Sequence, residues 1–381
     1  MIVRTDFERR WARLRQLMWQ QDMAALVVSE NGRSRYLTGY QRYFTATHVA
    51  PVHAVLMTLD GGPFLLRPRH VVPEPDEHAA QELIGLGLGE DARVEALGQL
   101  LHGTAAGERV GLELGFLGRN FVAKLASRLP RCQLVDADPL LRSATAVKFP
   151  DELAHIGEAA RLVDEGLAAG IAACRPGASE LEVAAAASAR MLEMGAEFIN
   201  HMTVRAGSHA AGNFPLPTYR RLAEGDCVQL DFGCVVNGYV SDTNRTVVVG
   251  RASVEQERLF EVGQRMLEAG VAAVRPGIPA AALWQACFQV AEAAGMAGRV
   301  TLPFCGHGIG LSLHEAPFVD PASTTILEEN MVLALEPGVY AAGIGGSRPE
   351  DMLRITADGA ELLSHFPRDA TLHRARQPQP A

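Results

Sequence analysis

The chain has 381 residues, of which 48% are hydrophobic and 21% charged, a composition typical of a globular protein large enough for two domains. Its formal net charge of -9 argues against nucleic acid or an anionic membrane as the partner, because no basic surface would neutralise phosphate groups. The N-terminal stretch is charged and amphipathic and no later apolar run reaches transmembrane length, so we expect a cytoplasmic protein.

The cysteines form no CxxC pair and no framework of regular spacing. We therefore expect reduced, mostly buried thiols without a catalytic role. The six residues are Cys132, Cys174, Cys227, Cys234, Cys287 and Cys305.

Residues 1–147 alternate between helical and strand-like patterns, which predicts a small α/β domain. Thr5 and Glu8 have the spacing of a capping box at the start of a first helix. Little chemistry is visible in this part of the chain. The segments expected to form strands are 24–28, 52–59, 110–113 and 133–135, and a helix is expected over 117–129.

The pattern changes near Lys148, where Pro150 stands in the first turn of a long helix with an apolar face. We place the domain boundary here, so that an N-terminal domain covers 1–147 and a second domain covers 148–368. The tail 369–381 is polar and contains prolines, and it is expected to be disordered.

The second domain contains an internal repeat. The segment 169–177 matches 269–277, 100 residues later, at seven of nine positions, including the final Arg-Pro-Gly. Leu-Asp-Phe-Gly at 230–233 corresponds to Leu-Glu-Pro-Gly at 335–338, 105 residues later. A single duplication of this length indicates two related halves of one domain, arranged about a pseudo-twofold axis. It would bring the acidic residue of each half towards a shared centre.

The segment 228–246 is predicted to form a β-hairpin around Asn237-Gly238, a dipeptide that tolerates positive φ at both central positions of a type I′ turn. This turn places Asp231 opposite Asn244, and Asp242 then points from the same face because strand side chains repeat at a period of two. Diagonal neighbours of this kind lie roughly 7 Å apart, which suits two carboxylates that share a pair of cations. A solvated hairpin is the alternative, but an unpartnered carboxylate would be costly to bury in such an apolar strand.

Further candidate ligands follow the hairpin. His307 lies in the sequence PFCGHGIGLSLHE at 303–315, between glycines that allow close backbone approach, and His314 comes seven residues later. Glu336 belongs to the second copy of the repeat, and Glu350 precedes a strand-like segment. Four carboxylates and one imidazole would repel or remain uncompensated unless divalent cations balanced them, and this donor set favours Mn²⁺, Co²⁺, Fe²⁺ or Zn²⁺. A pair of such ions acidifies a bridging water and polarises a carbonyl, as amide hydrolysis requires.

The order of these motifs resembles the pita-bread metallopeptidases, a family that includes methionine aminopeptidase, prolidase, aminopeptidase P and the creatinase-like enzymes. The likeness spans about residues 148–356. The N-terminal segment 34–40, Ser-Arg-Tyr-Leu-Thr-Gly-Tyr, also resembles a segment of the N-terminal domains of prolidases, creatinases and ectoine hydrolases. The motifs in chain order are DFG at 231–233, a DxxR-like DTNR at 242–245, GHGIGLxxHE at 306–315, LEPG at 335–338 and RxED at 348–351.

The resemblance implies a creatinase-type α/β domain followed by a duplicated α+β pita-bread domain with two divalent metal ions, Mn²⁺ being the first expectation. In the family, the equivalent of Glu336 also takes a proton from the attacking water, and His314 would contact the substrate carbonyl or the tetrahedral oxyanion. Arg348 would orient Glu350. Such enzymes act on small peptides or amides and are commonly dimers. The implied metal ligands are Asp231, Asp242, His307, Glu336 and Glu350.

Two departures from the family pattern bear on the substrate. Many prolidases and aminopeptidases have a histidine before the first aspartate strand, where this chain has Asn-Phe-Pro-Leu-Pro at 213–217. His209, a few residues upstream, either takes its place or lies on the surface. Aminopeptidase P has another histidine four residues before the metal histidine, where this chain has Pro303.

The favoured interpretation is a Xaa-Pro dipeptidase-like hydrolase. An enzyme alternative is a small-molecule amidohydrolase of the ectoine hydrolase or creatinase-like kind, and a dimethylsulfoniopropionate lyase on the same fold is more distant. A peptide-binding module without catalysis is the remaining alternative, and five filled ligand positions weigh against it.

Overall fold

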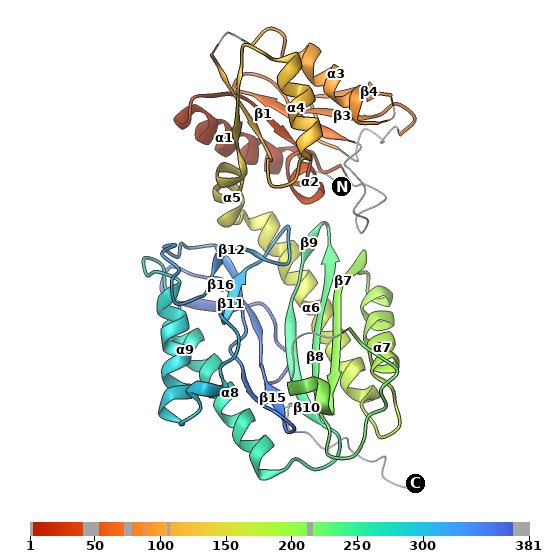
Figure 1. Ribbon diagram of the computed structural model, residues 1–381, viewed down its shortest axis with the longest axis vertical. Helices are drawn as coiled ribbons and strands as arrows, with labels where there is room; N and C mark the ends of the chain where they lie inside the picture. The colour runs from red at the N-terminus through yellow and green to blue at the C-terminus, as the bar shows by residue number, and fades with distance from the viewer. Residues whose placement is uncertain are drawn as a thin grey trace. The chain divides into compact units, whose positions relative to one another are not determined.

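The computed structural model describes residues 3–40, 53–71, 78–87, 89–104, 107–211 and 216–368 (Figure 1). The chain divides into two compact units, Met1–Thr145 and Ala146–Ala381, two residues before the boundary expected from the sequence. The expected tail 369–381 and most of the segment 213–217 lie outside the described residues. Within the described ranges, no helix combines the length and apolar character needed to cross a bilayer.

The N-terminal unit is built on a six-stranded mixed sheet with the strand order β4-β3-β2-β1-β5-β6. Its strands are β1 (Met23–Val28), β2 (Ala54–Thr58), β3 (Phe64–Pro68), β4 (Glu82–Leu86), β5 (Arg109–Leu112) and β6 (Gln133–Asp136). Its helices are α1 (Arg4–Gln20), α2 (Asn31–Thr38), α3 (Glu90–Leu100), α4 (Arg119–Arg128) and α5 (Asp138–Ala146).

Local sequence explains two details of this unit. The Tyr-Leu-Thr-Gly segment ends α2, because Gly39 adopts the left-handed conformation (φ 71°) that terminates a helix. The expected capping box at Thr5 is wrong: α1 begins at Arg4 with Val3 as its N-cap, which places Thr5 inside the helix.

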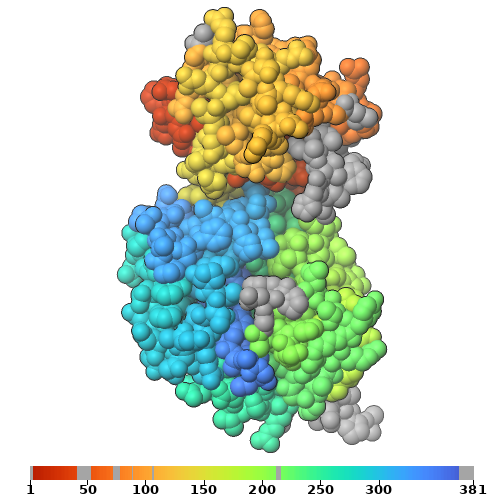
Figure 2. Space-filling model, viewed as in Figure 1, coloured from red at the N-terminus to blue at the C-terminus, as the bar shows by residue number. Residues whose placement is uncertain are grey.

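The second unit consists of two halves, each with two helices packed on a sheet (Figure 1). The first half contains α6 (Pro150–Ala173), α7 (Glu180–Glu193), β7 (Phe198–Ala206), β8 (Cys227–Val236), β9 (Tyr239–Val240) and β10 (Thr243–Val248). The second half contains α8 (Val254–Ala273), α9 (Ala281–Ala293), β11 (Gly306–Gly308), β12 (Glu315–Phe318), β13 (Val332–Leu335), β14 (Val339–Ala341), β15 (Gly345–Ser347), β16 (Asp351–Ile355) and β17 (Ala360–Leu362). Figure 2 shows the green surface of the first half meeting the blue surface of the second.

The repeat predicted from the sequence is present in the hydrogen bonds as well as in the elements. The Gly177 N–H donates to the Leu222 carbonyl over 2.8 Å, and the Gly277 N–H donates to the Leu327 carbonyl over the same 2.8 Å. These pairs are separated along the chain by the offsets of 100 and 105 residues that relate the two sequence copies. The duplicated α+β architecture is therefore confirmed in the local geometry of both halves.

Each half has its own apolar core, and a third cluster joins them. The joining cluster takes Ile156 from α6, Val235 from β8, Val332 from β13 and Met352 from β16, all nearly inaccessible to solvent. Strands from both halves therefore pack together behind the place where the acidic motifs meet.

Candidate metal centre

The first half contributes a hairpin whose register is the one predicted. Asp231 on β8 pairs with Asn244 on β10. The turn residues Asn237 and Gly238 have φ values of 49° and 80°, as a type I′ turn requires. Asp242 lies just before β10, and both aspartates are buried. The hairpin prediction is confirmed.

The second half contributes the other three predicted ligands. His307 lies on β11, Glu336 follows β13 and Glu350 precedes β16, and all three are buried. Because Leu335 pairs with Asp351, the two glutamates come next along these paired strands. The LEPG and RxED motifs therefore present their carboxylates at the same end of one strand pair.

Ligand atoms from both halves meet in one cluster. The Nε2 atom of His307 lies 3.5 Å from Oδ2 of Asp242 and 3.4 Å from Oε1 of Glu336. Ligand atoms of Asp242, His307 and Glu350 all lie within 4.8 Å of one another. An aspartate from the first half thus stands beside a histidine and two glutamates from the second.

A further imidazole, missed in the sequence, links Asp231 to this cluster. His201 lies on β7, and its Nε2 atom is 3.2 Å from Oδ1 of Asp231 and 3.0 Å from Oδ1 of Asp242. Gly233 makes room for this ring, because a Cβ at that position would collide with the imidazole and with the Ser241 carbonyl. The glycine of the DFG motif is a sequence feature that makes room for His201.

The electrostatics of the cluster fit divalent cations. Both carboxylate oxygens of Glu350 are buried and, within the described residues, have no hydrogen-bond partner. Burial, followed by the carboxylates of Asp242 and Glu336, raises the pKa of Glu350 well above its usual value. Burial opposes charge on His201 and His307, yet the neighbouring carboxylates raise the pKa of each to about 10. Cations would balance these carboxylates and satisfy the orphaned oxygens.

Arg348 contacts two of the carboxylates, but not the one expected. Its guanidinium group donates to Oε2 of Glu336 over 2.7 Å and also to Oδ2 of Asp231. The expectation that it orients Glu350 is not met, because both Glu350 oxygens lack a hydrogen bond. Burial opposes the charge on Arg348, but Asp231 and Glu336 raise its pKa well above the usual value. Arg348 therefore remains cationic and joins a carboxylate of each half.

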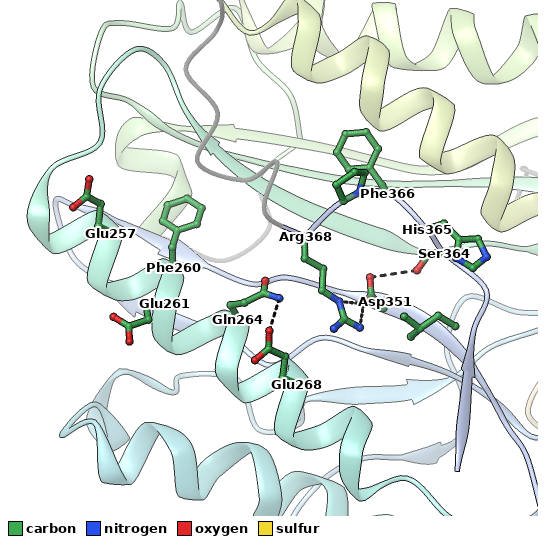
Figure 3. Close-up of a pocket in the computed structure, with 12 residues that line it drawn as sticks. Glu257, Phe260, Glu261, Gln264, Glu268, Asp351, Ser364, His365, Phe366 and Arg368 are labelled. Carbon is green, nitrogen blue, oxygen red and sulfur yellow. Dashed lines mark hydrogen bonds and ion pairs between the residues drawn. The ribbon is translucent and has the colours of Figure 1, made fainter. Parts of the chain in front are cut away.

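Arg245, the arginine of the DxxR-like motif, holds the backbone of Glu350 in place. Arg245 donates to the Glu350 carbonyl, to Oδ1 of Asp351 over 2.7 Å and to the Phe366 carbonyl over 2.6 Å. Figure 3 shows Arg368 pointing to Asp351 from a groove of about 730 Å³ between α8 and the segment 362–368. This groove lies beside the anchoring residues and contains none of the five predicted ligands.

His314 lies at the edge of the cluster on a braced loop. Its ring centroid is 4.3 Å from that of His307, and the residue is exposed. Partial burial of the ring against its neighbours, and then the nearby His307, lowers the pKa of His314, which favours the neutral imidazole. Glu315 accepts from the N–H groups of Leu311 and Ser312 and pairs with Lys148 over 2.9 Å. The loop that carries His314 is thus fixed at both sides.

His209 does not take part in this cluster. Its Nδ1 atom lies 2.9 Å from Oε1 of Glu180, a fully buried carboxylate on α7. Glu180 also accepts from the Thr218 hydroxyl over 2.7 Å. His209 therefore neither joins the metal cluster nor lies free on the surface. Through Glu180 it helps to hold the segment after β7.

Comparisons with known proteins agree with this arrangement. Residues 154–357 match the model of metallopeptidase family M24, and residues 10–146 match the creatinase/prolidase N-terminal domain. YkvY of Bacillus subtilis (strain 168) carries a provisional name as a dipeptidase. It is 34% identical over 238 residues, which is 62% of this chain and 65% of YkvY. A Xaa-Pro dipeptidase of Pyrococcus furiosus is 29% identical over 328 residues, covering 86% of this chain and 91% of that protein.

Solved structures extend the likeness to the whole fold. The crystal structure of dipeptidase PepE from Mycobacterium ulcerans has a TM-score of 0.85 and 28% identity, and the alignment covers 97% of this chain and 99% of that one. The family model spans more than half of the residues and includes every predicted ligand. The chain belongs to metallopeptidase family M24.

Proposed function

We propose that this protein is a dinuclear metal-dependent dipeptidase that hydrolyses the peptide bond of Xaa-Pro dipeptides. The observation that carries the proposal is the buried cluster of carboxylates and imidazoles, in which Glu350 has two oxygens without a partner. The likeness to the Xaa-Pro dipeptidase of Pyrococcus furiosus over most of both chains supports the choice of substrate.

The ions would be held by side chains from both halves, and Mn²⁺ is the metal we propose. When bound, two such ions supply an acidified water and a polarised carbonyl. The residues that we assign as ligands are Asp231, Asp242, His307, Glu336 and Glu350. His201 lies within reach of both aspartates and is a further candidate to hold or steady them.

Three residues would act on the substrate or on the groups that do. Glu336 takes a proton from the attacking water, and Arg348 holds its Oε2 atom so that the other oxygen is presented to the cluster. His314, exposed at the edge and favoured in its neutral form, donates a hydrogen bond to the carbonyl oxygen as negative charge develops there. The Lys148–Glu315 pair keeps the His314 loop in place during this step.

We assign this chemistry to residues 148–368, with residues 1–147 as a separate N-terminal domain. We also propose a cytoplasmic homodimer that takes small peptides and binds neither nucleic acid nor membranes, as the net charge of -9 favours. Sedimentation analysis at several concentrations would test the dimer.

A metal titration combined with a substrate comparison tests the proposal. The protein is stripped with a chelator, reconstituted with Mn²⁺ or Co²⁺, and assayed on Ala-Pro and on ectoine. We expect about two ions per subunit and hydrolysis of Ala-Pro only after reconstitution. Less than one ion per subunit would favour a binding module or a metal-free enzyme. Activity on ectoine alone would favour the small-molecule amidohydrolase and end the dipeptidase assignment.

A further inference from the structure

His201 completes one of two candidate ligand groups that share Asp242 among the described residues. The first group is His201, Asp231 and Asp242, and the second is Asp242, His307 and Glu350. Within each group the ligand atoms lie within 4.8 Å of one another, and each group combines one imidazole with two carboxylates. The five ligands expected from the sequence do not include His201. Without it, the first group would consist of two aspartates and would have no nitrogen donor.

The backbone of β7 aims the His201 ring at the two aspartates. Thr203 lies opposite Asp231 in the pairing of β7 with β8, and His201 is two residues before Thr203, so His201 and Asp231 point from the same face of the sheet. The register shifts between Ile199 and His201, which leaves Asn200 as an extra residue in β7. Bulges of this kind re-aim a side chain and are frequent beside active sites. The strand therefore carries the ring and, in the bulge, a polar neighbour for it.

The distances around the Nε2 atom of His201 suit a shared cation. This atom lies 3.2 Å from Oδ1 of Asp231 and 3.0 Å from Oδ1 of Asp242. Two donors that bind one ion at right angles, each about 2.1 Å from it, are themselves about 3.0 Å apart. A hydrogen bond also fits either distance, but Nε2 carries at most one proton and faces two carboxylates. One cation among the three atoms would satisfy all of them.

Asn200 stands beside the other ring nitrogen. Its amide Nδ2 atom lies 3.1 Å from Nδ1 of His201, and which of the two side chains donates depends on the tautomer of the ring. If the amide turns its oxygen to the ring, Nδ1–H donates to it and the lone pair of Nε2 faces the aspartates. That arrangement is repulsive unless a cation lies between Nε2 and the carboxylates. Ligating histidines typically have such an acceptor at the second nitrogen, and it fixes both the tautomer and the ring orientation.

We propose that His201 is a sixth protein ligand of the metal centre, which binds the ion nearer Asp231 through Nε2, and that Asn200 orients its ring through Nδ1. This proposal rests on the metal centre of the proposed function and is independent of the Xaa-Pro substrate. It gives each of the two ions one imidazole. Because imidazole suits Zn²⁺ whereas carboxylates suit Mn²⁺, loss of His201 should weaken Zn²⁺ binding more than Mn²⁺ binding.

Observing the imidazole nitrogens tests the proposal directly. The protein is produced with 15N-labelled histidine, loaded with Zn²⁺ and examined by 15N NMR. The parent should show metal-bound Nε2 signals from two histidines, of which one is absent in His201→Gln and the other in His307→Gln. His209→Gln is the matched control, because His209 belongs to the same half as His201 but contacts Glu180 instead of the cluster. It should keep both signals. A single metal-bound signal in the parent, retained in His201→Gln, would overturn the proposal.

Metal titrations of the same variants give an independent measure. His201→Gln should weaken the binding of one Zn²⁺ ion by about 100-fold or more, since even residues that only orient ligands cost 10- to 100-fold. The loss for Mn²⁺ should be smaller. Unchanged Zn²⁺ affinity in His201→Gln would contradict ligation by this residue.

Asn200→Asp tests the role of the neighbour and leaves His201 itself in place, so it remains informative if His201→Gln does not fold. A carboxylate can only accept, so it would preserve a hydrogen bond from Nδ1–H but abolish one donated to Nδ1. We expect Asn200→Asp to keep both metal-bound signals. Loss of the His201 signal in this variant would mean that Nδ1 accepts and that Nε2 carries the proton, and the proposal would fail.

None of these measurements requires hydrolysis, so failure of the proposal and failure of the proposed function are distinguishable. Two metal-bound imidazoles in a protein that hydrolyses no dipeptide would support His201 as a ligand and refute the dipeptidase. A single metal-bound imidazole in a protein that hydrolyses Ala-Pro would do the reverse. A parent that binds no Zn²⁺ would end both.

Discussion

The two halves of the catalytic unit share a frame but contribute different ligands. Asn244 stands opposite Asp231 in the first half, while the corresponding strand pair of the second half presents Glu336 and Glu350 together. Asn244 is fully buried, and its side-chain amide has no hydrogen-bond partner within the described residues. The first half supplies its second carboxylate from Asp242 instead. Duplication thus preserved the backbone while the ligand positions diverged.

The largest effect is expected from removing the Glu350 carboxylate, because the first half has Asn244 at the corresponding position. Glu350→Gln keeps the size of the side chain but removes the charge and one oxygen donor. We expect loss of one ion per subunit and a fall in kcat/KM of more than about 100-fold, since even residues that only orient ligands cost 10- to 100-fold. Elemental analysis and peptidase kinetics measure both.

Glu361→Gln is the control for that change, because Glu361 is an exposed glutamate of the same half that pairs only peripherally with Arg354 over 3.2 Å. It should keep full metal content and activity. If Glu350→Gln also retained both, Glu350 would not be a ligand.

Substitution of the DFG glycine, Gly233, and of the LEPG glycine, Gly338, provides a second comparison of the two halves. Gly233→Ala would push a Cβ into the His201 ring and the Ser241 carbonyl, whereas Gly338→Ala would meet Tyr340 at 3.0 Å and the Cβ of Arg348 at 3.3 Å, which are milder contacts. We expect Gly233→Ala to lower kcat/KM by about 10- to 100-fold through displaced ligands, and Gly338→Ala to have a smaller effect. Equal losses in the two variants would mean that His201 has no part in holding Asp231 and Asp242.

Each half also contributes an imidazole that is charged in the absence of metal. The neighbouring carboxylates raise the pKa of His201 and of His307 to about 10, so both imidazoles hold a proton near neutral pH, and burial raises the pKa of Glu350 as well. Ligands must release their protons to bind an ion, so metal affinity should rise with pH and fall on acidification, by about tenfold per pH unit for each proton displaced. Calorimetry in two buffers of different ionisation enthalpy counts those protons. Identical heats in both buffers would contradict the coupling.

Local rules predicted the parts of the site that lie close in sequence. The Asn237-Gly238 turn and the period-two alternation were sufficient to place Asp231 opposite Asn244, because a hairpin carries its register within itself. The repeat offset also related Asp231 to Glu336. These features depend on neighbouring residues or on duplication, and both are visible without a structure.

Contacts between distant segments could not be predicted in this way. His201 reaches the site through the pairing of β7 with β8, in which it is the register partner of Gly233. The contact of Lys148 with Glu315 spans 167 residues, and the forked contact of Arg348 to Asp231 spans 117. Motif spacing can nominate such residues, but only the packed core determines which of them meet.

The smallest expected effect concerns the helix glycines that the repeat places at equivalent positions. A Cβ at Gly170 would lie 3.0 Å from both Leu230 and Phe232, whereas one at Gly270 would lie 2.8 Å from Leu335 and 2.6 Å from the Cys287 sulfur. Gly270→Ala should therefore lower the free energy of unfolding by ~1–3 kcal/mol, as overpacking does. In Gly170→Ala the gain in helix propensity, about 1 kcal/mol, should offset most of a milder contact.

The contact between Cys287 and a methyl group at position 270 can be tested within the second half alone. If its contact with the new methyl group causes the loss, Cys287→Ala should harm the parent by leaving a small cavity but rescue part of the stability of Gly270→Ala. Urea unfolding of the parent, both single variants and the double variant gives the coupling free energy, which should be favourable by about 1 kcal/mol for residues in contact. A coupling of zero would locate the strain at Leu335 instead, next to the carboxylate of Glu336, and Gly270→Ala would then also lower metal affinity.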